Sequence, residues 1–117
     1  MFKLNIMLSE SNIKLIFFCL IIIAVIFEIF ADILFKKWSI ENKNILLAIG
    51  LIIYIVGTLF WAFSLKYGLL SKAAAIFTVL NLIILVLVGV IYFKENLSLI
   101  NKVGIALGIV SIILIEI

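Results

Sequence analysis

The chain of 117 residues alternates long apolar runs with short segments that carry lysine and other polar residues. The runs at 15–35, 45–65 and 73–93 each have about the 20 residues that a helix needs to cross a bilayer core of roughly 30 Å. A fourth run, at 98–117, reaches that length only with the polar residues at its start. Lipid offers no partner to unpaired backbone groups, and the runs are continuously apolar rather than alternating, so they predict helices rather than a barrel.

The connections between these runs are short, which predicts helices that alternate in direction. We therefore expect an all-α integral membrane protein whose single domain, residues 1–117, is an up-down bundle of four transmembrane helices. The segment 1–14 is polar at its end and mildly apolar, and we expect it to lie at the membrane interface, with a loose tail as the alternative.

Composition points the same way. Hydrophobic residues make up 68% of the chain and charged residues 13%, whereas a soluble domain has about 25% charged residues. A small soluble fold cannot bury that much apolar surface, which excludes a cytosolic enzyme, a nucleic-acid-binding protein and a disordered chain. Histidine is absent and there is one cysteine, so the sequence predicts no metal site, cofactor or catalytic pair. We expect a multi-pass protein of the cell (plasma or inner) membrane.

The lysines give almost no orientation signal. The positive-inside rule compares the basic residues on the two sides of the membrane. With four spans, one side carries four lysines and the other five; they are Lys3, Lys14, Lys66 and Lys72 against Lys36, Lys37, Lys43, Lys94 and Lys102. This balance leaves two interpretations open, namely insertion in both directions with antiparallel pairing, or one orientation set by other features.

Four helices are too few to enclose a substrate cavity, which favours a homodimer. Gly104 and Gly108 form a small-xxx-small pattern that allows close helix contact. Gly50 and Gly57 are seven residues apart on one helix face and are candidates to seat a neighbouring helix.

Two acidic residues, Glu28 and Asp32, interrupt the first apolar run and share one helix face at i, i+4 spacing. A carboxylate at bilayer depth is costly and usually faces a cavity or a partner. A single carboxylate that holds either a proton or a cation is the physical basis of proton-coupled exchange. For Asp32 we favour an ordinary ion pair with Lys36 over a role in that exchange. For Glu28 a structural hydrogen bond is the alternative.

Four further side chains are candidates for a cation site. Tyr54 and Trp61 share a face of the second run, and Phe77 and Asn81 are four residues apart in the third. Aromatic faces beside a carboxylate suit a cationic substrate. The alternative is that these rings serve packing or the aromatic belt at the membrane interface.

The run EIFADILFK, residues 28–36, resembles the first helix of the small multidrug resistance exporters, in which a glutamate precedes a lysine by eight residues. Tyr54 and Tyr67 fall on tyrosines of that family. The stretch FKENLSLINKVG, residues 93–104, resembles a loop and helix start shared across the drug/metabolite transporter (EamA-like) superfamily. The resemblance implies an antiparallel homodimer, or a heterodimer with a paralogue, in which two Glu28 carboxylates share one chamber and exchange protons for cationic compounds.

The chain also departs from that family. Ala74 and Phe77 stand where the family has a tyrosine and a tryptophan, and Asp32 is an additional acid, so polyamines or guanidinium compounds become plausible substrates. The second half resembles flippase subunits that move aminoarabinose-linked undecaprenyl phosphate, through Trp61, Asn81 and the ENLS segment at 95–98. A flippase for a polyprenyl-phosphate-linked sugar is therefore the alternative function. The first-helix glutamate is absent from those subunits, which favours the antiporter.

Overall fold

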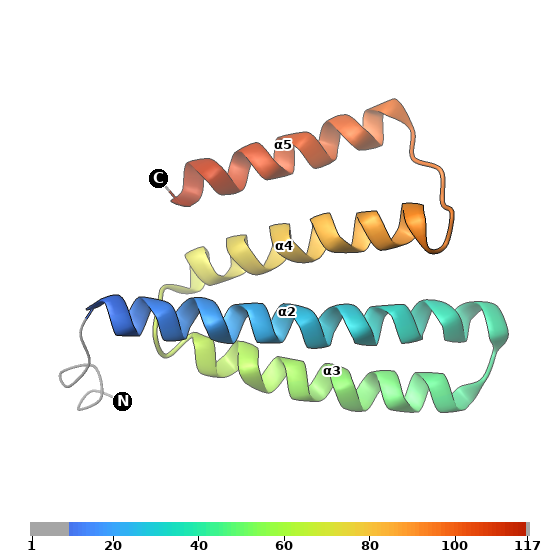
Figure 1. Cartoon of the computed structure of the whole chain (residues 1–117), viewed down its shortest axis with the longest axis horizontal. Coiled ribbons are helices and arrows are strands. Elements are labelled where there is room, and N and C mark those ends of the chain that lie inside the picture. The colour runs from blue at the N-terminus through green and yellow to red at the C-terminus, as the bar shows by residue number, and fades with distance from the viewer. Residues whose placement is uncertain (1–9, 117) are drawn as a thin grey trace.

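The computed structural model describes residues 10–116. Within this range it contains four helices and no strand. The helices are α2 (Glu10–Glu41), α3 (Asn44–Ser64), α4 (Leu70–Ile91) and α5 (Leu99–Glu116). Successive helices run in opposite directions (Figure 1). The predicted all-helical, up-down architecture is confirmed.

The four helices lie in one layer rather than around a common core (Figure 1). The molecule measures 50 × 35 × 17 Å, and its thickness is less than that of two stacked helices, each about 10 Å across. The long helix α2 is central, with α3 along one side, α4 along the other and α5 beyond α4 (Figure 1). One broad face of α2 is partly covered by side chains of both neighbours, since Trp61 of α3 and Phe77 of α4 pack against the buried cluster that includes Ile21 and Val25.

Three of the helices, α2, α3 and α4, are long and apolar enough to cross a membrane, whereas α5 is a shorter apolar helix. The chain is a multi-pass membrane protein. Helix α2 has 32 residues, so it is about 48 Å long and extends beyond the apolar core of a bilayer. Of the predicted interfacial segment, residues 10–14 form the start of α2, and the rest lies outside the described residues.

The connection after the first span is much shorter than the sequence suggested. We expected a loop at 36–44, but α2 continues to Glu41 and only two residues separate it from α3. Asn42 ends the helix in the left-handed region, with φ 58°, and its N–H donates to the carbonyl oxygen of Trp38 at 2.8 Å. Asparagine tolerates this conformation, which closes a helix in little space.

Small residues bring α2 and α3 close together. Ala24 and Ala31 are fully buried on α2, seven residues apart, and face Gly57 and Gly50 on the antiparallel α3. A Cβ added at Gly57 would lie 2.9 Å from the Cβ of Phe27 and 3.4 Å from the carbonyl oxygen of Ala24. The glycines of the second span therefore lie against the first span within one protomer.

Helix α5 is the least embedded element and contacts mainly α4. Gly104 is exposed, and no atom lies within 4 Å of a Cβ added there. At Gly108 an added Cβ would be 3.4 Å from Leu82 Cδ2 of α4. The small-xxx-small pattern is thus split, with Gly108 against a neighbour and Gly104 facing open space.

Candidate functional site

A pocket of about 300 Å³ lies over α2, between α3 and α4. It brings together four of the predicted site residues from three helices, namely Glu28, Tyr54, Trp61 and Phe77. Because α3 and α4 flank α2 on opposite sides, the pocket sits on one broad face of the layer. It is open, so the protomer alone does not seal it.

Helical spacing explains how α3 and α4 supply their side chains. Tyr54, Thr58 and Trp61 follow one another at i, i+4 and i+7, which keeps them on one face of α3. Ala74 and Thr78 are likewise four residues apart on α4. The small Ala74 contributes little volume, which leaves room beside Glu28.

Glu28 is a partly buried acid in largely apolar surroundings. Within residues 10–116 it forms no ion pair. The rings of Trp61 and Phe77 meet edge-on at one wall, with centroids 5.0 Å apart and planes at 61°. A carboxylate beside aromatic rings offers a cation both a charge partner and ring faces.

The threonine hydroxyls add polar atoms to this pocket. Thr58 donates from Oγ1 to the carbonyl oxygen of Tyr54 at 2.9 Å, which leaves that hydroxyl free to accept a hydrogen bond. Thr78 reaches the pocket from the opposite wall. Sequence reasoning missed both threonines, although their i+4 spacing from Tyr54 and Ala74 was a usable signal.

Asp32 lies outside the Glu28 pocket. It lines a smaller pocket of about 140 Å³ toward the end of α2, together with Lys36, Gly89 and Glu95. The expected ion pair between Asp32 and Lys36 is wrong. Lys36 Nζ instead lies 3.4 Å from Glu95 Oε2, because the loop after α4 brings a carboxylate to α2 that is distant in sequence.

Asn81 is also separate from the Glu28 pocket. It lines a pocket of about 360 Å³ whose walls include Thr78 and Glu95. The Asn81 Oδ1 atom is buried and has no hydrogen-bond partner among the residues described. A buried polar atom without a partner is costly in a folded protein, so this acceptor is available to a ligand or to water.

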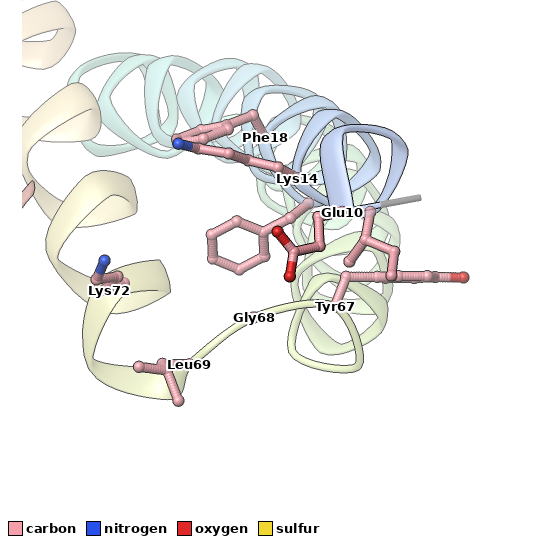
Figure 2. Close-up of a pocket in the computed structure, with 9 residues that line it drawn as sticks. Glu10, Lys14, Phe18, Tyr67, Gly68, Leu69 and Lys72 are labelled. Carbon is pink, nitrogen blue, oxygen red and sulfur yellow. The ribbon is translucent and has the colours of Figure 1, made fainter. Parts of the chain in front are cut away.

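Another pocket, of about 380 Å³, lies at the opposite end of α2 from Asp32. Figure 2 shows Glu10 at the start of α2 facing the connection between α3 and α4, with Lys14 and Lys72 at the rim. Neither Glu28 nor any other predicted substrate-binding residue lines it. Across residues 10–116, no three histidine, cysteine or acidic side chains are placed to hold a metal ion.

Comparison with known proteins identifies the family. The family model described as the EamA-like transporter family matches residues 4–117, nearly the whole chain. No curated protein and no solved structure matches the chain.

Proposed function

The chain belongs to the EamA-like transporter family, within the drug/metabolite transporter superfamily, and we propose that it is a proton-coupled antiporter that exports small or hydrophobic cations. The observation that carries the proposal is the position of Glu28. This acid lies well inside a membrane-spanning helix and lines a pocket with three aromatic side chains from the neighbouring helices. Ionisable groups at membrane depth commonly mark substrate or proton pathways.

Exchange follows from competition for one carboxylate. When Glu28 holds a proton it is neutral, and it offers a cation no charge partner. When the cation binds, the carboxylate is ionised and the proton has left. The two ligands are thus linked by an unfavourable, positive coupling free energy at the same group, and each drives the other off. Transport then requires that the pocket open to the two sides of the membrane in turn.

A second copy of the chain is the best candidate to close the pocket. The layer is 17 Å thick, and the Glu28 pocket opens on one of its broad faces. A homodimer that stacks these faces would enclose two Glu28 carboxylates in one chamber. The near-equal lysine count on the two sides supports an antiparallel pair, because neither orientation is strongly favoured. A paralogue in place of the second copy would give the same geometry.

Transport by purified protein in liposomes tests this function. With a pH gradient imposed, we expect uptake of tetraphenylphosphonium and phenylguanidinium, the two probe cations. Glu28→Gln should abolish that uptake while the protein still reconstitutes, and Glu28→Asp should retain part of it. The matched control is Glu41→Gln, which removes an acid paired with Lys43 at 3.5 Å on the exposed end of α2.

The same preparation separates the antiporter from the flippase. If Glu28→Gln leaves cation uptake equal to that of the parent protein, the antiporter proposal fails. Movement of a polyprenyl-phosphate-linked sugar between leaflets, without proton exchange, would then establish the flippase function instead.

A further inference from the structure

The Glu28 pocket is the first of three pockets that share lining residues. Thr78 lines both the Glu28 pocket and the Asn81 pocket. Leu85 and Glu95 line both the Asn81 pocket and the Asp32 pocket. The three pockets therefore follow one another along α4, from the middle of the membrane span to the loop after α4.

Polar atoms lie in each of these three neighbouring pockets. Thr78 stands at the first junction, and the buried Asn81 Oδ1 lies beyond it without a partner. Glu95 stands at the second junction, with Asp32 in the last pocket. Each of these groups accepts hydrogen bonds, as a path for a cation requires.

The loop after α4 is shaped to hold Glu95 against that helix. Lys94 adopts the left-handed conformation, with φ 55°, and the N–H of Glu95 donates to the carbonyl oxygen of Gly89 at 2.9 Å. The Glu95 carboxylate then occupies the space that a side chain at Gly89 would need, since an added Cβ would lie 2.6 Å from Glu95 Oε1. The absence of a side chain at Gly89 thus leaves room for this carboxylate.

The ion pair with Lys36 shows what kind of group the Glu95 carboxylate binds. The Lys36 ammonium, 3.4 Å from Glu95 Oε2, is a primary alkylammonium tethered to α2. The two side chains remain 45% and 46% exposed, so water and solutes reach the pair. A charge pair this exposed is weak, about 1 kcal/mol or less, and a competing cation can replace its lysine.

We propose that Glu95 is a second cation-recognition residue, which admits cations bearing N–H donors to the route toward Glu28 by exchanging them for the Lys36 ammonium. The inference rests on the proposed function and adds selectivity to it. An ammonium or guanidinium group donates hydrogen bonds to a carboxylate as Lys36 does. A phosphonium cation has no N–H and cannot replace Lys36 in this way.

Uptake of the two probe cations, phenylguanidinium and tetraphenylphosphonium, into liposomes tests the inference. Glu95→Gln should lower the initial rate of phenylguanidinium uptake by about fivefold, which corresponds to one partly exposed charge pair. The rate for tetraphenylphosphonium should change by less than about twofold. Lys36→Gln frees Glu95 and should strengthen binding of phenylguanidinium to detergent-purified protein, again with little effect on tetraphenylphosphonium.

A second variant keeps all charges and moves only the carboxylate. Gly89→Ala places a methyl group against Glu95 Oε1, the flexible end of a side chain, so Glu95 shifts while the helix stays intact. We expect the selectivity change of Glu95→Gln in a weaker form. Glu41→Gln, which breaks the other surface ion pair near the same end of α2, is the matched control and should leave selectivity unchanged.

Each outcome has one meaning. Equal slowing of both probes in Glu95→Gln, or the same result as in Glu41→Gln, overturns the role of Glu95. If uptake depends on Glu28 but not on Glu95, only this inference fails. If Glu28→Gln has no effect, the antiporter function itself fails. Should Glu95→Gln not reconstitute, unchanged selectivity in Gly89→Ala and Lys36→Gln overturns the inference.

Discussion

The indole ring of Trp61 meets the phenyl ring of Phe77 edge-on, with their centroids 5.0 Å apart. This contact joins α3 to α4 across α2, which otherwise separates the two helices. It forms one wall of the pocket that contains Glu28. The width of the candidate site is therefore set by two rings from helices that have little other contact.

Removing one of these rings should weaken binding of aromatic cations. We expect Phe77→Ala and Trp61→Ala each to raise the dissociation constant of tetraphenylphosphonium by about fivefold, because one ring contact is worth roughly 1 kcal/mol. Trp61→Phe keeps a ring and should lose less. Isothermal titration calorimetry of the detergent-purified variants measures the dissociation constants. Unchanged affinity in both alanine variants would place the binding site elsewhere.

Gly57→Ala should destabilise the protein. The added methyl would meet the Cβ of Phe27 at 2.9 Å, and that atom is fixed by the α2 backbone, so the two helices must separate. Overpacking of this kind costs about 1–3 kcal/mol. Thermal unfolding in detergent measures the loss.

The matched control for this variant is Gly104→Ala on α5. Its added Cβ meets nothing within 4 Å, so this variant has no packing penalty and should be at least as stable as the parent protein, because alanine favours a helix over glycine by about 1 kcal/mol. If the Gly104 and Gly57 variants unfold at the same temperature, the close approach of α2 and α3 is not as described.

Lys94→Gly should stabilise the loop after α4. Lys94 has φ 55°, a conformation that glycine adopts without the steric cost of about 1 kcal/mol that other residues meet there. Lys94→Ala removes the same charge and retains that cost, so the difference between the two variants isolates the backbone effect. A glycine variant no more stable than the alanine variant would contradict the left-handed conformation.

The balance of lysines predicts that orientation is easily shifted. Replacing Lys37, Lys43 and Lys102 by glutamine leaves two lysines on one side against four on the other. We expect a reporter fused to the C-terminus to be found on both sides of the membrane in the parent protein and mainly on one side in this variant. A parent protein with its reporter on one side only would exclude insertion in both directions.

Much of the fold follows from local pattern. The lengths of the apolar runs specify the helices, because a helix is the one way for a single segment to satisfy its backbone in lipid. The positions at which the helices end were predicted less accurately. The sequence predicted a connection at 36–44 after the first span, but lysine is a good helix former, and α2 continues through positions 36 and 37 to Glu41 before Asn42 closes it.

The candidate site was also predictable in part from the local sequence pattern. Glu28, Tyr54, Trp61 and Phe77 stand out as polar or aromatic groups with helical spacing, and the structure brings them into one pocket. Asp32 and Asn81 have the same spacing signals but line other pockets. Spacing identifies the face of a helix, whereas the position of the next helix decides which residues on that face meet.

The sequence by itself determined that this chain is a multi-pass helical protein with an acid inside its first span, because the bilayer fixes both the helical state and the cost of that acid. Only the tertiary structure decided that the helices form a single layer and that Lys36 pairs with Glu95. The reason is that an ion pair between residues 59 positions apart depends on how a loop turns back toward a distant helix. No local sequence pattern predicts the contact between Lys36 and Glu95, since it results from the packing of α4 against α2.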